Sequence, residues 1–315
     1  MRPNYSYNPE LRKPGLGVDV TSDAPHKRLW IVLQNAWNAA ACRLWRCPDG
    51  VVRKRVRFAA RDGHQLSAWL LEPAGQAQKR LPCVLYCHGG AFFFSIYDSN
   101  LTIGAVLARE LGCRVLLPQY RLSLTHPYPT GQQDCEDALL WLLNREDVDR
   151  ARLLLYGDSA GGCLAAQTAV ACRDRGYARP LGQMLIYPVT DRAGDYSSLK
   201  SYAHGTWSTR ANENMWRVYL RRAQPADGCA VPMEQPELTG LAPAYVEAAE
   251  MDALCDQALA YAEKLAAAGV PTCCTAVPGA YHGYDGDQTS PLVQRVMKDR
   301  LLWLRQQLQS EAVQG

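Results

Sequence analysis

Short runs of β-branched and apolar residues alternate with helical patterns from about residue 51 onward. This alternation is typical of a mainly parallel sheet covered by helices, because parallel strands are joined by helical crossovers. Single α/β domains commonly reach the 315 residues of this chain, so we expect one. The expected strands are Val51 to Ala59, Ser67 to Leu71, Pro82 to Cys87, Arg114 to Pro118, Leu153 to Tyr156, Gln183 to Tyr187, Ala244 to Ala249 and Thr272 to Val277.

Apolar residues recur at three and four positions in most of the stretches between these strands, which predicts helices there. The turn Arg61-Asp62-Gly63 joins the first two strands and favours an antiparallel start. The eighth strand would lie at a sheet edge, and pairing across that edge would give a homodimer. The helices are expected near 98–112, 132–145, 160–175, 255–268 and 291–309.

Two regions do not fit the alternation. Residues 1–50 contain Leu and Trp at helical spacing, and residues 190–235 are rich in Tyr, Trp, Arg and Ser. Either region is compatible with an ordinary surface elaboration, but aromatic insertions after strands often form lids over a site. We therefore expect 1–50 to be a cap segment and 190–235 a cap insertion, with 51–189 and 236–315 forming the α/β domain.

The charge pattern argues against nucleic acid as a partner. There are 34 Lys and Arg against 31 Asp and Glu, and the basic residues are scattered. The most basic stretch, Arg53, Lys54, Arg55 and Arg57, alternates with valines, which is typical of the solvated face of a strand.

The 12 cysteines predict no disulfide scaffold, since that inference belongs to short secreted chains, and no signal peptide opens this sequence. Pairs such as Cys83/Cys87 lack zinc spacing, so no metal is expected. We interpret the cysteines as mainly buried free thiols in a reducing cytoplasm. No apolar run approaches the roughly 20 residues of a membrane span, so we expect no membrane partner.

The segment Gly157 to Gly162, GDSAGG, contains the candidate nucleophile Ser159. The preceding residues are typical of a buried strand and the following ones of a helix, so Ser159 lies at a strand-to-helix turn. The flanking glycines leave room for a strained backbone there, and the helix amino terminus favours developing negative charge. The alternative is that the glycines permit close packing and the serine caps the helix.

A second glycine motif, His88-Gly89-Gly90-Ala91-Phe92, follows the expected third strand. Acyl transfer places charge on the carbonyl oxygen, and backbone amides are the usual means of stabilising it. The amides of Gly89, Gly90 and Ala160, the residue after the serine, are the predicted oxyanion hole. His88 would then brace the loop; a plain glycine turn is the alternative.

A serine nucleophile requires a base, and the chain has six histidines: His26, His64, His88, His126, His204 and His282. The first four lie in a polar segment, a hairpin turn, the glycine loop and a proline-rich loop. His204 lies in the presumed lid. His282 follows the eighth strand, where a loop can return the imidazole over the carboxyl ends of the strands, so we predict that it is the base.

The orienting acid is expected between the serine and the histidine in chain order, after a strand end. Asp252 lies at the exit of the seventh strand and is the predicted acid. Glu250 and Asp256 are close rivals, although Asp256 is better placed to cap or face the next helix. Asp285 is too local to His282 to support it.

Together these motifs resemble the hormone-sensitive lipase-like carboxylesterases of the α/β-hydrolase superfamily. The resemblance implies an α/β-hydrolase fold with an eight-stranded, mostly parallel sheet flanked by helices and covered by a helical cap. It also implies the triad Ser159, Asp252 and His282, and requires no cofactor. The matching pieces are 88–92, 120–123 with 126–129, 157–162, the Asp252 segment and 282–284.

Three positions depart from the family's pattern. Gln119 replaces the usual Asp before Tyr-Arg, Leu124-Thr125 replaces Pro-Glu, and Ala253 replaces the Pro that commonly follows the acid. None of these residues is a reacting group, so the departures bear on loop bracing and subfamily.

The leading hypothesis is a serine esterase for small esters, acting through an acyl-enzyme. Similar enzymes favour short to medium acyl chains, so acetyl esters are candidate substrates, and Phe92, Phe93 and Trp207 are the predicted lining of the acyl pocket. One alternative is an amidase or formamidase with the same triad. Another is a non-catalytic receptor on the same fold, but related receptors have lost the histidine that this chain retains at His282.

Overall fold

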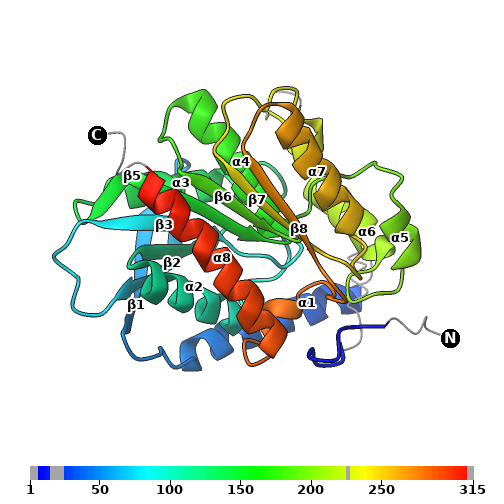
Figure 1. Cartoon of the computed structure of the whole chain (residues 1–315), viewed down its shortest axis with the longest axis horizontal. Coiled ribbons are helices and arrows are strands. Elements are labelled where there is room, and N and C mark those ends of the chain that lie inside the picture. Colours follow the sequence, from blue (N-terminus) through cyan, green and yellow to red (C-terminus); the bar gives the residue numbers. More distant parts are fainter. Residues whose placement is uncertain (1–5, 15–24, 225–227, 311–315) are drawn as a thin grey trace.

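The computed structural model describes residues 6–14, 25–224 and 228–310 (Figure 1). Its centre is an eight-stranded sheet in the order β1-β2-β4-β3-β5-β6-β7-β8. The β1–β2 and β2–β4 pairs are antiparallel and all other neighbours are parallel, which confirms the predicted sheet. The strands are β1 (Val51–Ala59), β2 (Gln65–Pro73), β3 (Leu81–Cys87), β4 (Arg114–Pro118), β5 (Val148–Asp158), β6 (Gly182–Ile186), β7 (Ala244–Ala249) and β8 (Thr272–Val277).

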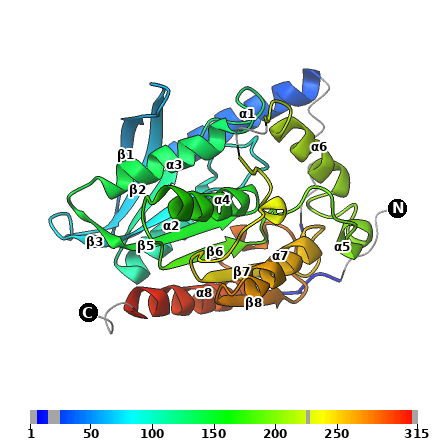
Figure 2. The same cartoon turned by 90° about the horizontal axis from the view of Figure 1, so that it is seen from above.

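Helices cover both faces of the sheet (Figure 2). Helices α2 and α8 pack on one face, and α3, α4 and α7 pack on the other. Short helices α5 and α6 occupy the insertion after β6. The bounds are α1 (Pro25–Leu44), α2 (Asp98–Leu111), α3 (Thr130–Leu143), α4 (Ala160–Arg175), α5 (Ser197–Ser201), α6 (Thr209–Tyr219), α7 (Cys255–Ala267) and α8 (Pro291–Ser310), with 3₁₀ turns at Pro232–Glu234 and Tyr284–Gly286.

Strand β3 contributes side chains to the hydrophobic cores on both faces of the sheet. Cys83 and Leu85 point into the core beneath α3, α4 and α7, whereas Val84 and Tyr86 point into the core beneath α2 and α8. Successive side chains of a strand face opposite sides, so a strand covered on both faces is apolar throughout. Strand β3 is therefore packed on both faces up to the end that precedes the glycine loop.

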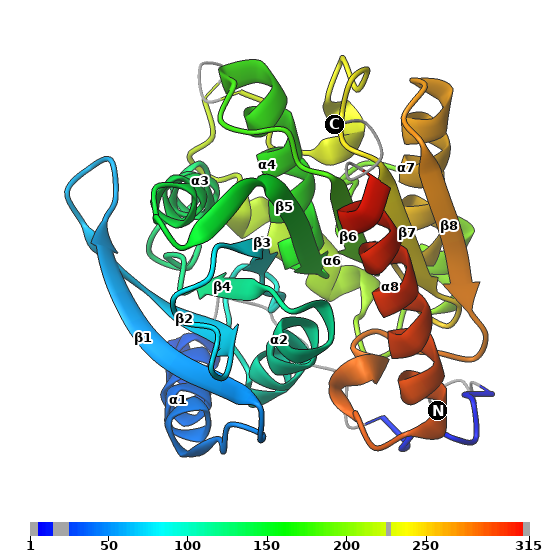
Figure 3. The same cartoon turned by 60° about the vertical axis from the view of Figure 1, so that its left-hand side comes forward.

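Helices α1, α5 and α6 lie toward the carboxyl ends of the parallel strands (Figures 1 and 3). Helix α5 is fixed to the first turn of α7, because the Ser198 amide donates to Asp256 Oδ2 at 2.8 Å. The Ser198 hydroxyl also donates to the Ala253 carbonyl at 2.9 Å. These contacts hold the insertion near the strand ends; the division into cap and α/β domain remains a prediction.

The cysteines agree with the sequence-based interpretation. All 12 lie in described parts of the chain, all are free thiols, and most are buried. Cys273 and Cys274 are exposed because they lie on β8, which is an edge strand, as predicted.

Candidate active site

Ser159 occupies a strained turn between β5 and α4. Its φ of 55° and ψ of −121° lie outside the regions that L-residues favour. The turn is held by the Ser159 amide, which donates to the Ile186 carbonyl at 2.8 Å, and by the Val189 amide, which donates to the Ser159 carbonyl at 3.0 Å. The neighbouring strand β6 thus fixes the backbone that presents the hydroxyl.

The glycines of GDSAGG are required by close backbone contacts. A Cβ atom on Gly157 would lie 2.1 Å from the Gly161 carbonyl oxygen, and one on Gly161 would lie 2.0 Å from the carbonyl oxygen of Cys87. Helix α4 can therefore start directly against the ends of β3 and β5 only when both positions lack a side chain.

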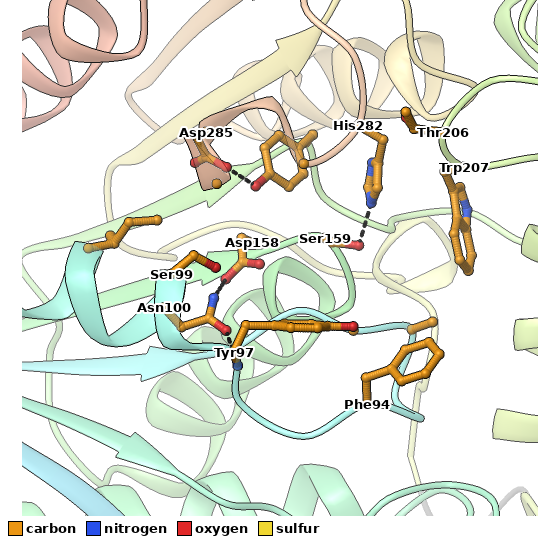
Figure 4. A pocket seen from close by; sticks show the side chains of 16 residues that line it. Phe94, Tyr97, Ser99, Asn100, Asp158, Ser159, Thr206, Trp207, His282 and Asp285 are labelled. Atoms are coloured by element: carbon orange, nitrogen blue, oxygen red, sulfur yellow. Dashed lines mark hydrogen bonds between the residues drawn. The ribbon is translucent and has the colours of Figure 1, made fainter. Parts of the chain in front are cut away.

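The Ser159 hydroxyl, the His282 imidazole and the Asp252 carboxylate form a continuous chain of hydrogen bonds (Figure 4 shows the first). Ser159 Oγ lies 2.8 Å from His282 Nε2, and His282 Nδ1 lies 2.6 Å from Asp252 Oδ2. Asp252 is 1% exposed and also accepts from the Leu254 amide at 3.1 Å. Asp252 therefore favours the His282 tautomer in which Nδ1 carries the proton. Nε2 is then free of a proton and can accept a hydrogen bond from the Ser159 hydroxyl.

The other acids near His282 have different partners. Glu250 accepts from the Gly279 amide at 2.7 Å, and Asp256 accepts from Ser198. Asp285 accepts from Tyr187 and, at 2.7 Å, from Arg300. The structure thus brings Asp252, rather than its rivals, to the imidazole.

The glycine loop after β3 differs in one respect from the prediction. The amide of Gly89 donates to Asp158 Oδ2 at 3.1 Å, so it is already engaged, and the prediction that Gly89 contributes to an oxyanion hole is wrong. Gly90 and Ala91 line the cavity beside Ser159. Their φ angles of 110° and 56° turn this part of the loop toward the serine.

His88 braces this loop from below, which agrees with its predicted role. Its ring is fully buried, stacks on Tyr120 at 4.3 Å and contacts the Gly89 carbonyl through Nδ1 at 2.7 Å. Burial lowers the pKa of His88 to about 4, because the charged imidazolium would lose its hydration. The ring is therefore neutral under ordinary conditions.

A cavity of about 240 Å³ opens beside Ser159 (Figure 4). Phe94 and Trp207 line one side of it, and Asn100 and Asp158 line the other. The Trp207 ring lies 5.8 Å from the His282 ring. The cavity therefore offers both an apolar wall and a polar wall to a molecule bound at the serine.

Phe92 and Phe93 do not line this cavity, and their predicted contact with substrate is wrong. Phe92 is 1% exposed and stacks on Tyr219 at 3.9 Å, and Phe93 is fully buried. The reason is the loop conformation, since positive φ angles at Ala91 and Phe92 rotate the phenylalanine run so that only Phe94 reaches the cavity.

Asp158 is a site residue that sequence reasoning missed. Its carboxyl group is buried beside the nucleophile and bonds the Gly89 amide, with the Asn100 amide 3.5 Å away. Burial, and secondarily the charge of Asp285, raises the pKa of Asp158 to about 7. The one available signal was an acidic residue directly before the serine, at the end of a strand whose preceding residues are apolar.

Known proteins share this architecture. The family described as alpha/beta hydrolase fold matches residues 84–285. An ethyl acetate hydrolase of Pseudomonas putida is 35% identical over 244 residues, which cover 73% of this chain and 74% of the relative. The esterase LipI of Mycobacterium tuberculosis is 33% identical over 220 residues, which cover 68% and 69%.

Solved structures agree with the sequence comparisons. A bacterial heroin esterase superposes with a TM-score of 0.82 at 28% identity and covers 93% of this chain and 94% of its own. The esterase LipW of Mycobacterium marinum superposes equally well, with a TM-score of 0.82 at 28% identity, over 91% and 92% of the two chains. The fold, the ordered motifs and these relatives lead to one conclusion: the chain belongs to the alpha/beta hydrolase fold family, within its hormone-sensitive lipase-like carboxylesterases.

Proposed function

We propose that the protein is a carboxylic ester hydrolase for short acyl esters, with Ser159, His282 and Asp252 as its catalytic triad. The observation that carries this proposal is the pair of hydrogen bonds, 2.8 Å and 2.6 Å long, that joins the three side chains. A serine hydroxyl is a weak nucleophile at neutral pH, and an oriented imidazole is the base that activates it. The intact triad also speaks against a purely binding role.

In the acylation half of the reaction, His282 Nε2 removes the hydroxyl proton while Ser159 Oγ attacks the ester carbonyl. The tetrahedral intermediate collapses when the imidazolium gives this proton to the leaving alcohol. In the second half, His282 activates a water molecule, which releases the acid and restores the serine. Apart from the water molecule, side chains and backbone amides of the protein supply every group used in these steps, so the mechanism invokes no cofactor.

The amides of Gly90, Ala91 and Ala160 are the proposed oxyanion hole. Gly90 and Ala91 line the cavity next to Ser159, and Ala160 is the first residue of α4. The first amides of a helix have no partner within the helix, so the Ala160 amide is available to a developing oxyanion. In this proposed set, the Ala91 amide takes the place of the Gly89 amide that the sequence predicted, because the Gly89 amide binds Asp158.

The size of the cavity supports a short acyl group. Its volume of about 240 Å³ is below the range of roughly 300–1,000 Å³ typical of pockets for drug-sized ligands. Phe94 and Trp207 supply the apolar wall for the acyl chain. One relative is named for the hydrolysis of ethyl acetate, an ester of two small groups.

Residues 1–50 and 190–235 are proposed to form the cap over this cavity. Thr206 and Trp207 of the insertion line the cavity, and Trp30 of α1 packs edge-on against Phe94.

A homodimer formed across the free edge of β8 and a location in the cytoplasm also remain proposals. The free state of the cysteines supports a reducing compartment.

The test is turnover of p-nitrophenyl esters from acetate to decanoate by the wild type and by Ser159→Ala. We expect the highest rates with acetate and butyrate, and a loss of kcat of roughly a million-fold in the variant. Ser99→Ala removes another hydroxyl from the same cavity wall and is the matched control, with kcat within about threefold of the wild type. Undiminished turnover by Ser159→Ala would refute the proposal, and faster cleavage of the matched anilides would identify an amidase instead.

A further inference from the structure

Helix α1 has the reverse of the usual polarity of a surface helix. Its outer face, defined here as Leu29, Trp30, Val32, Leu33, Trp37 and Leu44, is apolar, and its side chains are between 43% and 81% exposed. A surface helix normally turns its apolar stripe toward the core. Contiguous apolar groups of this kind on a surface mark an interaction site.

The inner side of α1 is held by polar contacts. The Asn35 side chain donates to the Phe93 carbonyl and accepts from the Ser95 amide, both at 2.9 Å, and Asn38 donates to the Ser95 carbonyl at 3.3 Å. Ile31 is the large apolar side chain buried on this side. These bonds fix the orientation of the helix, so the outer face cannot turn inward without breaking them.

The surroundings of the outer face are basic. Residues 25–44 contain Lys27, Arg28 and Arg43 and no Asp or Glu. Arg221, which follows α6, lies close enough to Arg222 and Arg28 for their like charges to lower its pKa, after the larger effect of burial. Figure 2 shows α1 and α6 toward the same edge of the molecule. The apolar face is therefore bordered by positive charge.

We propose that the outer face of α1 docks on an anionic lipid surface. Trp and Leu side chains would enter the boundary between head groups and acyl chains, and the basic side chains would contact the head groups. A second copy of the chain is a poorer partner, because two positively bordered faces would repel each other. The sequence-based expectation of no membrane partner considered only segments that could span a bilayer. Among the described helices none is long and apolar enough to do so. A helix lying on the surface needs no such length.

The outer face of α1 lies close to the active site, so docking would bear on access to substrate. Trp30 packs edge-on against Phe94 with ring centroids 5.7 Å apart, and Phe94 lines the catalytic cavity. Docking would bring the cavity close to esters that partition into the lipid. Lipid binding itself is independent of the proposed esterase activity and is measured without a substrate.

The experiment is flotation of the full-length protein with vesicles of phosphatidylcholine alone and with 30% phosphatidylglycerol, at low and high salt. We expect binding to the anionic vesicles that weakens at high salt, and at least a tenfold loss of binding for Leu33→Ser/Trp37→Ser. Leu302→Ser is the matched control, because Leu302 is 57% exposed on α8, far from α1 in the sequence, and its variant should bind as the wild type does.

Three results would overturn the proposal: no binding to anionic vesicles, equal binding by the wild type and the double variant, or a wild-type dimer in sedimentation that the double variant converts to a monomer. The last result would assign the face to a second copy. Turnover of p-nitrophenyl acetate, a water-soluble ester, should be unchanged in the double variant, which shows that the variant is folded.

Discussion

At the scale of single residues, the choice of Asp252 over its neighbours is the sharpest test of the site. We expect Asp252→Asn to lower kcat by roughly 10⁴-fold, because an amide in place of the carboxylate favours the wrong imidazole tautomer. Glu250→Gln, two positions earlier, should change kcat by less than about twofold, since Glu250 bonds Gly279 rather than His282. Steady-state kinetics with p-nitrophenyl acetate measures both, and equal losses would contradict the assignment.

Asp158 gives a prediction about pH. Its pKa is about 7 in the folded protein against an ordinary value of 3.8, so between these values the folded state holds a proton that the unfolded state releases. The stability that the folded state gains from holding this proton is complete near pH 3.8 and is lost as the pH rises to about 7. The free energy of unfolding of Asp158→Asn, minus that of the wild type, should therefore increase from about pH 4 to pH 7 and then level off.

Urea unfolding at several pH values measures this difference. Titration of His88 occurs in both proteins and cancels in the subtraction. A difference that stays constant with pH, or that decreases, would show that Asp158 is ionised throughout. The amide oxygen of an Asn can still accept from Gly89, so the variant should keep the loop in place.

The sequence predicted which side chains the structure brings together at Ser159 better than it predicted the residues around them. Ser159 and His282 could be found because their order and their positions after strands follow from the chemistry and from the topology. Gly89 was misassigned because its amide binds Asp158. Phe92 was misassigned because positive φ angles at Ala91 and Phe92 turn its ring away from the cavity, and neither residue type favours that conformation.

At the scale of elements, most strand bounds were predicted closely, and the polar start of β5 was missed. The bounds of β4 and β7 agree residue by residue, since both strands are apolar and end at a change of pattern. Strand β5 begins at Val148, five residues before its predicted start, because the polar residues before Leu153 continue the strand up to the pairing of Leu81 with Val148. Helices in 190–235 were not resolved by periodicity, since they are short.

The contact between α1 and the loop after β3 should affect catalysis at a distance. Asn35→Ala removes two hydrogen bonds to residues 93 and 95, which carry the chain away from the proposed oxyanion amides. We expect a loss of about 1–2 kcal/mol in stability and a severalfold decrease in kcat with little change in KM. Ala36→Gly is the matched control: it weakens the same helix by about 1 kcal/mol but leaves the loop contacts, so its kcat should not change. Equal kcat values for the two variants would mean that α1 only adds stability.

At the scale of the whole molecule, a buried polar cluster joins distant parts of the chain. Arg300 of α8 is fully buried and donates to Glu247 on β7 at 2.9 Å, to Asp285 at 2.7 Å and to the Tyr156 hydroxyl on β5 at 3.1 Å. Asp285 lies three residues after His282, so this cluster also anchors the histidine loop. Sequence reasoning could not find it, because its members are far apart in the chain and each is unremarkable in its own segment.

Arg300→Met should be strongly destabilising, because it leaves the carboxylates of Glu247 and Asp285 buried without a cation. Breaking a buried pair from one side typically costs about 3–5 kcal/mol, whereas replacing every charged member removes most of that cost. Urea unfolding should therefore show a large loss for Arg300→Met and partial recovery in Arg300→Met/Glu247→Gln/Asp285→Asn. The control is Arg295→Met on the same helix, where the pair with Glu10 is largely exposed and contributes at most about 1 kcal/mol.

A small effect of Arg300→Met, similar to that of Arg295→Met, would show that water reaches the cluster and that the charges are not buried in solution. If the triple variant is instead stable but has a low kcat at an unchanged KM, the cluster positions His282 in addition to stabilising the fold. That result would follow from the chain of contacts, because Asp285 and His282 share one short loop whose far end is fixed to α8 by Arg300. Measuring stability and kcat on the same three proteins separates the two contributions, which no single substitution can do.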